Sequence, residues 1–373
     1  MKNYLNYIIK YIPDKNREKK IKSIGKVKYD LPFIKSFVLE IENKDKNILQ
    51  SMCDPKLIYK NTSITAQINI AKKTVNADFV NKNGYTGKNI NICLLDTGIS
   101  PIKDFIYPKN RIIFFKDFIN NKTIPYDDNG HGTHVAGIIA GNGFLSQKKY
   151  SGIAPDVNII CLKILDSEGK GNSADVLAGL QWVADNKKKF NIKIINLSVG
   201  SKDDGSEDPL INAVENLWDD GITVVIAAGN NGPEKSSVTS PGTSKKVITV
   251  GASDDNKTVN IFGDSLINFS GRGPTSKCVI KPDVIAPGAN IVSCRSLEAK
   301  NLNLLDNNYA IMSGTSMATP IVSGAIALLL EKNPELTPNQ IKLKLKNSTV
   351  DLNYSRNQQG WGLIDIKKFV LGD

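Results

Sequence analysis

The chain has 373 residues, 40% hydrophobic and 23% charged, and this composition excludes a chiefly disordered or fibrous protein. The length suits one large domain and a small one. The net charge of +11 is uneven, because residues 1–65 hold 14 Lys and Arg against 7 Asp and Glu, a balance of +7. The remainder holds 34 of the 48 basic and 30 of the 37 acidic residues, a balance of +4, so the main body gives little support to nucleic-acid binding.

The spacing of the cysteines and the apolar stretches indicate the expected cellular compartment of the protein. The five cysteines are scattered and form no C-x-x-C pair, which indicates free thiols in a reducing compartment. The start, Met1 to Ile12, is interrupted by Lys10 and has no small-residue cleavage site after it, so we expect no secretory signal and a cytoplasmic location. The stretch Met312 to Leu330 is uncharged, but its serines, threonines and Pro320 favour a helix buried in protein over a membrane span.

The first 65 residues predict a small α+β unit. Residues 1–28 are basic and rich in Lys and Asn, and we expect a helix there, followed by a loose segment. Residues 34–41 predict a strand, 44–52 a short helix and 56–64 a second extended stretch. A larger domain, residues 66–373, is expected to follow.

A different pattern begins at Asn89, where apolar strands alternate with helices. Strands such as 90–95 are almost continuously apolar, as in a sheet that is covered on both faces. The alternation predicts an α/β fold with a doubly wound, mostly parallel sheet and helices on both faces. We expect strands at residues 90–95, 111–115, 158–165, 192–197, 222–227 and 247–250, and helices at 131–140, 173–188 and 208–220, with Ser173 as the N-cap of the second helix.

Polar residues follow three of these strands. Asp96, Ser198 and Asn230 each come at or just after the end of an apolar run. In open parallel sheets the ligand site lies beyond the carboxyl ends of the strands. We therefore expect these three residues to share one edge of the sheet.

A serine stands at a loop-to-helix boundary late in the chain. Ser316 follows Gly314 and precedes a long run of small and apolar residues, and Pro320 is expected in the first helical turn, where its missing N–H is tolerated. The first N–H groups of a helix lack internal partners and could bind a developing oxyanion beside the serine hydroxyl. A plain N-cap is the alternative interpretation for a lone serine.

The chain has only two histidines, both in the segment Asn129–Gly137. A serine needs a base to act as a nucleophile at neutral pH, and His131, at the start of a helix, could supply it across a cleft. His134, one turn later, is expected inside the structure. Asp96 could accept a hydrogen bond from the His131 ring and fix its tautomer, although an Asx-turn is an alternative for that residue alone. A metal site at His-x-x-His lacks the zincin Glu and an obvious third ligand.

Five motifs stand in an order that resembles the subtilisin-like serine proteases: LLDTGI, NGHGTHVAG, INLSVG, VIAAGNNGP and SGTSMATPIVSGAIALL. The match runs from about Ala77 to the C-terminus. Through YDDNGHGTHVAG and FSGRGPT it resembles the intracellular subtilases of Gram-positive bacteria. The resemblance implies a subtilisin-like fold and a serine endopeptidase that cleaves extended polypeptides through an acyl-enzyme, with no cofactor required for the chemistry.

The resemblance also implies roles for single residues. Asp96 would be the orienting acid, His131 the general base and acid, and Ser316 the nucleophile. Asn230 would donate its side-chain amide, and Ser316 its backbone N–H, to the oxyanion, although Asn230 by itself could equally be a turn residue beside glycine. Residues that would bind substrate are Ser198, Val199 and Gly200, paired with its backbone, and Ala228 and Gly229, the wall of the main specificity pocket.

The N-terminal segment of this family is often a pro-region that assists folding and blocks the cleft. Residues 1–65 are therefore a candidate intramolecular chaperone and inhibitor, removed by self-cleavage near Thr62 to Ala71, and a permanent extension is the alternative. Asp104 lines up roughly with a calcium-binding aspartate of secreted relatives. The glycine-rich loop that completes that site is not recognisable between Ala140 and Gly152, so structural calcium is only a weak expectation.

Two other classes of function are alternatives for this sequence. Residues 169–174 match a loose G-x-G-x-x-A, the pattern of dinucleotide-binding proteins, but no acidic residue ends the next strand to hold a ribose. Asp166 and Glu168 would also repel a pyrophosphate. The other class is an inactive relative that binds peptides without cleaving them. Nucleic-acid and membrane partners are not expected.

Overall fold

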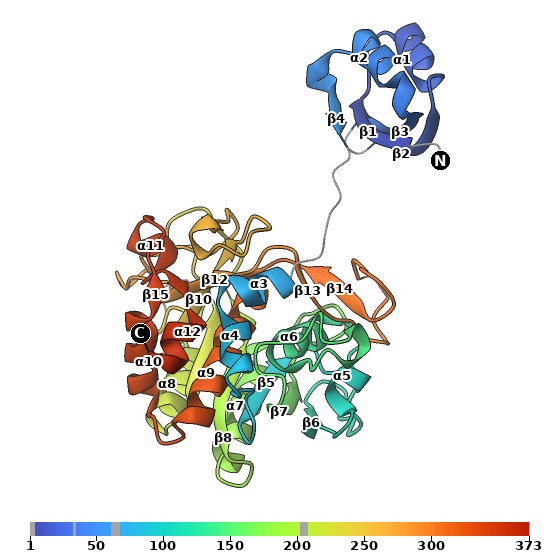
Figure 1. Ribbon diagram of the computed structural model, residues 1–373. Helices are drawn as coiled ribbons and strands as arrows, with labels where there is room; N and C mark the ends of the chain where they lie inside the picture. The colour runs from blue at the N-terminus through green and yellow to red at the C-terminus, as the bar shows by residue number, and fades with distance from the viewer. Residues whose placement is uncertain (1–3, 33–34, 61–67, 202–207, 301, 373) are drawn as a thin grey trace. The chain divides into compact units, whose positions relative to one another are not determined.

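The computed structural model describes residues 4–32, 35–60, 68–201, 208–300 and 302–372 (Figure 1). The chain divides into two compact units, Met1–Thr65 and Ala66–Asp373. Each unit has a hydrophobic core of its own, so each is described by itself.

The first unit is a four-stranded antiparallel sheet with two helices, in the strand order β2-β3-β1-β4. The expectation of a helix and a loose segment over residues 1–28 was wrong, because strands stand on both sides of a single helix. The sequence signal was the alternation that buries Tyr7 and Ile9 but leaves Ile8 half-buried. The elements are β1 (Tyr4–Lys10), α1 (Lys15–Lys22), β2 (Lys26–Leu31), β3 (Ser36–Glu42), α2 (Lys46–Met52) and β4 (Ile58–Lys60).

The core of this unit lies between one face of the sheet and the helices. Alternate residues of β1 and β3 point inward and meet Ile21 of α1 and Leu49 of α2. The opposite face carries Ile8 and Val38, and the edge strand β2 leaves Tyr29 exposed. The core cluster thus lies on one face of the sheet, as is common for antiparallel sheets, although Val38 on the opposite face is also buried.

The second unit is built on a ten-stranded sheet in the order β15-β16-β12-β10-β9-β8-β5-β7-β6, with β11 beside β10. The strands from β6 to β16 pair in parallel along this order, whereas β11 and β15 are antiparallel to their neighbours. A small two-stranded sheet, β13-β14, stands apart. The strands are β5 (Asn91–Asp96), β6 (Ile112–Asp117), β7 (Asn158–Lys163), β8 (Ile192–Leu197), β9 (Thr223–Ala227), β10 (Ile248–Asp254), β11 (Ser265–Leu266), β12 (Val284–Pro287), β13 (Ile291–Cys294), β14 (Tyr309–Met312), β15 (Thr349–Val350) and β16 (Leu363–Ile364).

Helices cover both faces of this sheet, which confirms the doubly wound α/β fold (Figure 1). On one face α6 and α9 pack together, and α9 lies across β8, β9, β10 and β12. On the other face α7 and α8 pack together against β5 and β9. The helices are α3 (Ile68–Thr74), α4 (Ala77–Lys82), α5 (Lys103–Ile106), α6 (His131–Ala140), α7 (Ser173–Asn186), α8 (Pro209–Asp219), α9 (Thr315–Lys332), α10 (Pro338–Asn347), α11 (Arg356–Gln359) and α12 (Ile366–Leu371).

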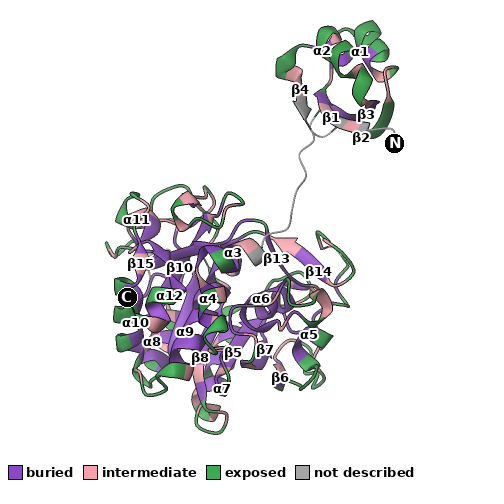
Figure 2. Ribbon diagram, in the orientation of Figure 1, coloured by how far each residue is buried: buried purple, intermediate pink, exposed green. Residues whose placement is uncertain are grey.

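Helix α9 is the central helix of the larger unit. Its residues from Met317 to Leu330 are all buried, and the helix is purple along this length in Figure 2. A helix that is apolar all round suits a site inside a large protein. In the described part of the chain, no helix has the length and apolar character needed to cross a bilayer.

Two details of the helix ends differ from the expectations. The N-cap of α7 is Asn172 rather than Ser173, because the Asn172 side chain accepts a hydrogen bond from the N–H of Asp175 at 2.9 Å. Pro320 lies inside α9 and beyond its first turn. It therefore removes the N–H that would bond to the carbonyl of Ser316, four residues earlier.

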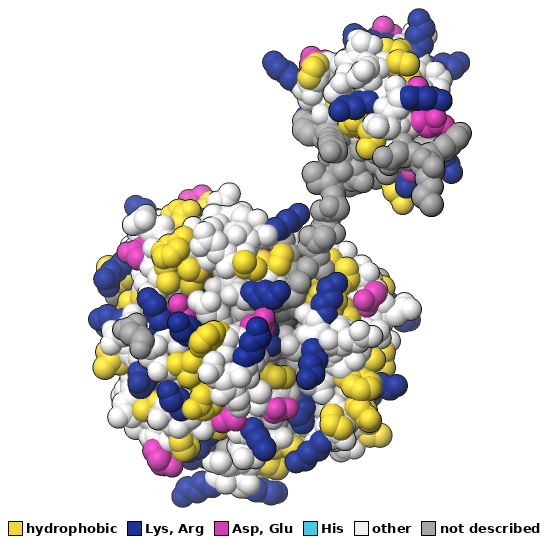
Figure 3. Space-filling view, in the orientation of Figure 1, with side chains coloured by type: hydrophobic (Ala, Val, Ile, Leu, Met, Phe, Trp, Pro, Cys, Tyr) yellow, Lys and Arg dark blue, Asp and Glu magenta, His cyan; other side chains and the backbone are white. Residues whose placement is uncertain are grey.

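Basic side chains are spread over the face drawn in Figure 3 among acidic and apolar ones. On that face Lys and Arg do not merge into one stripe along the larger unit. The mixture of charges on this face agrees with the nearly balanced charge of residues 66–373.

Candidate active site

A buried carboxylate and an imidazole form the centre of the site. Asp96 ends β5 and is 0% exposed, and His131 begins α6 with a side chain that is 25% exposed. The Nδ1 of His131 lies 2.7 Å from Oδ1 of Asp96, and the N–H of Thr97 donates to the same oxygen at 2.7 Å. Because a carboxylate only accepts, Nδ1 carries the hydrogen and Nε2 is left as the proton acceptor of a neutral ring.

Two glycines, Gly98 and Gly132, let the loop that follows Asp96 and the first turn of α6 approach each other. A Cβ added at Gly132 would lie 2.2 Å from the carbonyl oxygen of Gly98 and 3.2 Å from Cβ of Asp96. Gly98 itself has a φ of +130° and packs on the carbonyl of Tyr126. The glycines of the two motifs, Asp-Thr-Gly and His-Gly-Thr-His, are therefore needed for close backbone contact.

Asp127 holds this arrangement together, although sequence analysis did not single out this residue. Its Oδ1 accepts from Thr97 Oγ1 at 2.8 Å and from the N–H groups of Gly130 and Asn129 at 2.8 and 3.2 Å. Its Oδ2 accepts from the N–H and Oγ1 of Thr133 at 2.8 and 2.6 Å. The buried carboxylate of Asp127 thus links the loop that follows Asp96 to the first turn of α6.

The surroundings of His131 act on its pKa in opposite directions. Burial lowers the pKa, whereas the negative charge of Asp96, its hydrogen bond and the charge of Asp127 raise it. The net pKa of His131 lies above the ordinary value of 6.5. The imidazole is therefore a better base than a free histidine.

His134 lies inside the structure, as expected, and is 0% exposed. Its Nε2 is 3.1 Å from the carbonyl oxygen of Ile291 and 3.2 Å from that of Ala310, so this nitrogen donates. Burial, with the charge of His131 adding to it, lowers the pKa of His134 to about 3. The two histidines therefore have separate partners and do not form a metal-binding pair.

Ser316 is half-buried in the first turn of α9. Its hydroxyl donates to the carbonyl of Ser198 at 3.1 Å, and the Ser198 hydroxyl donates to the carbonyl of Ser316 at 3.4 Å. That second carbonyl is the one that Pro320 leaves without a helical partner. Among the described residues no hydrogen bond joins Ser316 to His131, but Ser198 and His131 line the same cleft. A change of the Ser316 rotamer would redirect its hydroxyl, and such bonds are often incomplete without substrate.

A short relay fixes the Asn230 side chain. The N–H of Gly229 donates to Thr315 Oγ1 at 3.2 Å, and this hydroxyl donates to Oδ1 of Asn230 at 3.0 Å. The N–H of Thr315 donates to the same oxygen at 2.9 Å. The amide nitrogen of Asn230 therefore remains as the donor end, and it lies 3.3 Å from where a Cβ of Gly314 would stand. Sequence analysis did not single out Thr315, although it directly precedes the candidate nucleophile.

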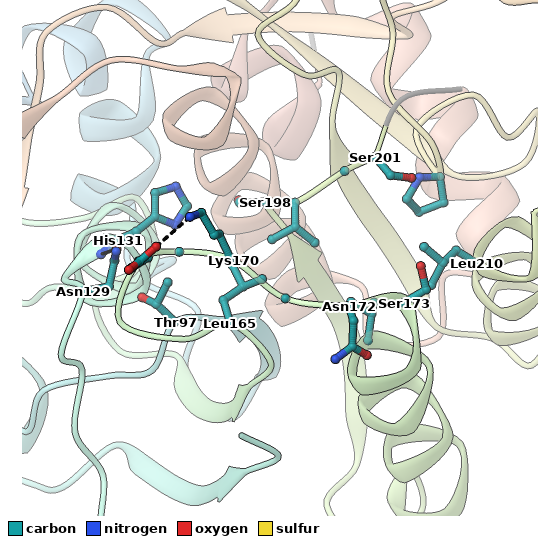
Figure 4. Close-up of a pocket in the computed structure, with 17 residues that line it drawn as sticks. Thr97, Asn129, His131, Leu165, Lys170, Asn172, Ser173, Ser198, Ser201 and Leu210 are labelled. Atoms are coloured by element: carbon teal, nitrogen blue, oxygen red, sulfur yellow. Dashed lines mark hydrogen bonds and ion pairs between the residues drawn. The ribbon is translucent and has the colours of Figure 1, made fainter. Parts of the chain in front are cut away.

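A cleft of about 590 Å³ runs from His131 past Ser198, Val199 and Gly200 to Leu210 and Pro241. Figure 4 shows His131 near one end of it and Leu210 near the other. Ala228 and Gly229 follow β9 next to Asn230 and are not among the residues that line this cleft. The structure thus places Ser198, Val199 and Gly200 along the same cleft as His131, and Asn230 against Thr315, the residue before Ser316.

The glycine-containing loop 169–174 also borders the cleft. The N–H groups of Lys170 and Glu168 donate to Oδ1 of Asp166 at 2.9 and 2.8 Å, and these bonds lower the pKa of Asp166. Lys170 pairs with Glu168 at 2.6 Å, the dashed line in Figure 4. The loop donors therefore serve a carboxylate of the protein, which disfavours the dinucleotide interpretation.

Asp104, the weak calcium candidate, is 0% exposed. Its Oδ1 accepts from the N–H of Leu145 at 2.8 Å, and its Oδ2 accepts from the Tyr309 hydroxyl at 2.7 Å and faces the Cys294 thiol at 3.6 Å. No group of three or more His, Cys, Asp or Glu arranged for a metal occurs among the described residues. Since protein donors occupy both oxygens, these surroundings do not fit a calcium ion.

Known proteins resemble this chain over most of its length. Residues 87–362 match the model of the subtilase family. The chain is 43% identical to serine protease AprX of Bacillus subtilis (strain 168) over 81% of this chain and 71% of that protein. It is 32% identical to subtilisin DY of Bacillus licheniformis, over 79% and 95% of the two chains.

Among solved structures, a cold-adapted subtilisin-like serine proteinase superposes with a TM-score of 0.58 and 31% sequence identity. The superposition covers 75% of this chain and 88% of the other. These likenesses confirm the family that the five motifs indicated. The chain belongs to the subtilase family and is a subtilisin-like serine protease.

Proposed function

We propose that this protease hydrolyses peptide bonds with Asp96, His131 and Ser316 as its catalytic triad. The observation that carries the proposal is the 2.7 Å contact between the buried Asp96 carboxylate and Nδ1 of His131. It holds the ring in the tautomer whose Nε2 can accept a proton. Ser198, which lines the cleft of His131 and bonds to Ser316, supports the placing of the nucleophile in that cleft.

In the first half of the proposed reaction, the peptide bond is cleaved and the enzyme is acylated. Nε2 of His131 takes the proton of the Ser316 hydroxyl as its oxygen attacks the carbonyl carbon of the scissile bond. The tetrahedral adduct collapses when His131 gives that proton to the leaving nitrogen, so the C–N bond breaks and an acyl-enzyme remains. In the second half, His131 activates a water molecule that releases the acyl group and restores the hydroxyl.

The negative charge of the tetrahedral adduct needs fixed donors. We assign this role to the side-chain amide of Asn230 and the backbone N–H of Ser316. The two hydrogen bonds from Thr315 to Oδ1 of Asn230 support it, because they leave the amide nitrogen as the free end of a fixed group. Ser316 also stands where helix N–H groups lack helical partners.

The substrate of this reaction would be an extended polypeptide. Ser198, Val199 and Gly200 follow β8 along the cleft and would pair with the substrate backbone as an added strand. Ala228 and Gly229 would form the opposite wall, beside Asn230. Binding of this kind draws affinity from the main chain and leaves selectivity to individual pockets.

The N-terminal unit would act as an intramolecular chaperone and inhibitor, which makes the full chain a zymogen. Its separate core and the half-buried Ile8 on the sheet face outside that core are the features that support a docking role. Self-cleavage near Thr62 to Ala71 would release it. Much of this segment, residues 61–67, lies outside the described residues.

A reducing compartment such as the cytoplasm is the proposed location. All five cysteines are free thiols, and four of them are buried. Burial raises the pKa of Cys93, Cys161 and Cys294, which keeps these thiols protonated and unreactive. Thiols of this kind agree with an environment that does not form disulfides.

The raised pKa of His131 predicts how kcat/KM falls at low pH. The ring must be neutral to accept the Ser316 proton, and its pKa lies above 6.5, so kcat/KM should fall with a midpoint above 6.5 as the pH is lowered. Initial rates on a chromogenic peptide from pH 5 to 9 give this midpoint. His134, with a pKa of about 3, does not contribute in that range. A midpoint below 6.5 would contradict the pairing of His131 with Asp96.

Substitutions of Asn230 and Thr315 test whether the Asn230 side chain stabilises the oxyanion. Asn230→Ala should lower kcat by about 10²–10³-fold with little change in KM, the loss measured for the side-chain oxyanion donor of subtilisin itself. Thr315→Val removes one of the two bonds to Oδ1 and should cost roughly tenfold or less, as for one neutral hydrogen bond. Thr315→Ser keeps the hydroxyl and serves as the matched control. Unchanged kcat in Asn230→Ala removes this residue from the role.

Intact mass tests the proposed maturation. Wild-type protein should lose its N-terminal segment on incubation, whereas Ser316→Ala should keep its full length, because cleavage needs the nucleophile. The mass of the shortened chain identifies the bond that is cut. If both proteins keep the same length, self-processing is excluded and the permanent extension is retained.

A further inference from the structure

We propose that Asp255 and Asp264 bind one hard divalent cation, Ca²⁺ or Mg²⁺, where the chain turns between β10 and β11. Asp255 directly follows β10 and Asp264 directly precedes β11. The site includes none of the proposed catalytic residues, and it does not include Asp104. The cation would have no part in the chemistry, and its role would be to hold the β10–β11 hairpin together.

The register of the two strands places the carboxylates opposite each other. β10 and β11 pair in antiparallel fashion, and the last pair before the turn is Asp254 with Ser265. The next pair in this register is Asp255 with Asp264. Opposite residues of antiparallel strands have Cβ atoms about 4.5–5.5 Å apart, and like charges at such a pair destabilise a hairpin. A bound cation would turn this repulsion into attraction.

Side-chain hydrogen bonds confirm that the two ends of the turn are close. The amide nitrogen of Asn256 donates to the carbonyl of Gly263 at 2.9 Å and to Oγ of Ser265 at 3.0 Å. Asn256 directly follows Asp255, and its two acceptors lie on either side of Asp264 in the chain. The turn is therefore closed beside the pair of carboxylates.

Each carboxylate keeps one oxygen without a protein donor. Asp255 is 1% exposed, and its Oδ1 accepts from the N–H of Lys257 at 3.0 Å. Asp264 is 7% exposed, and its Oδ2 accepts from the Ser253 hydroxyl at 2.6 Å. Oδ2 of Asp255 and Oδ1 of Asp264 are buried and have no hydrogen-bond partner among the described residues. Asp104 differs in this respect, because protein donors occupy both of its oxygens.

The charges that act on the pair are negative. Burial raises the pKa of Asp255 to about 6 and that of Asp264 to about 7, and the neighbouring charge of Asp254 raises both further. Carboxylates held away from water are costly unless a positive charge pairs with them. Hard divalent cations prefer oxygen ligands of this kind, and water and main-chain oxygens would complete the coordination shell.

The hairpin supports the loop that carries Asn230. The N–H of Gly232 donates to the carbonyl of Phe269 at 2.9 Å, and the N–H of Gly271 donates to the carbonyl of Gly229 at 2.9 Å. The segment that follows β11 is thus joined to the chain on both sides of Asn230. A cation that fastens the hairpin would therefore stabilise the larger unit close to the proposed oxyanion donor.

The test uses the full chain with Ser316→Ala, so that self-cleavage does not disturb the measurement. After treatment with EDTA and dialysis, isothermal titration with CaCl₂ and with MgCl₂ should show one bound ion per chain for at least one of the two cations. That cation at saturation should raise Tm by at least about 2 °C, because a ligand of the folded state stabilises it. NaCl at the same ionic strength should not reproduce the shift.

Asp255→Asn and Asp264→Asn, each added to this chain, keep the size of the side chain and remove one charge. Each should weaken cation binding by at least about tenfold and abolish the shift in Tm, and either one suffices if the other does not fold. Asp254→Asn is the matched control. Alternation places its side chain on the other face of β10, so it should retain both the binding and the shift.

Two results would overturn the proposal. One is that neither Ca²⁺ nor Mg²⁺ binds saturably or raises Tm beyond the effect of NaCl, which leaves the two carboxyl groups to share a proton. The other is that binding is unchanged in both Asp255→Asn and Asp264→Asn, which places the ion elsewhere in the chain. Either result leaves the proposed triad untouched.

Discussion

The site depends on one hydrogen bond, between the imidazole of His131 and a carboxylate that has no contact with solvent. A buried Asp96 would be costly if it were isolated, and the N–H of Thr97 and the ring of His131 are the donors that offset this cost. The same carboxylate raises the pKa of the ring against the effect of burial. The orientation and the tautomer of the proposed base follow from this contact, and Asp96 together with the charge of Asp127 raises the pKa of the ring.

The fold also positions the other proposed site residues around the pair formed by Asp96 and His131. Asp96 ends β5, and Ser198 and Asn230 come after the neighbouring parallel strands β8 and β9, so the same sheet edge carries all three. Helices α6 and α9 pack together and supply His131 and Ser316 from their first turns. Pro320 adds a local adjustment, because it leaves the Ser316 carbonyl to the Ser198 hydroxyl. Rigid strands and buried helices hold each group more firmly than surface loops would.

Much of the fold and the candidate triad could be predicted from the sequence, because hydrophobic periodicity and the order of motifs can be read along the chain. Continuous apolar runs predicted the parallel strands, and the resemblance carried by five ordered motifs implied Asp96, His131 and Ser316 as the candidate triad. Other features depend on contacts between distant segments. Asp127 acts by joining Thr97 to the start of α6, and the Thr315 relay needs Gly229 and Asn230 beside it. The first 28 residues were misjudged because lysines and asparagines obscured a short alternating strand.

The rate at which a fluorophosphonate probe modifies the protein tests the central claim most directly, because the probe reports activation of Ser316 without a substrate preference. Intact mass of mature-length protein should show a single adduct on wild type and none on Ser316→Ala. Asp96→Asn, which keeps the size of the side chain but removes its charge, should slow the modification by about 10⁴-fold. Equal rates for wild type and Asp96→Asn, or an adduct on Ser316→Ala, would contradict the account.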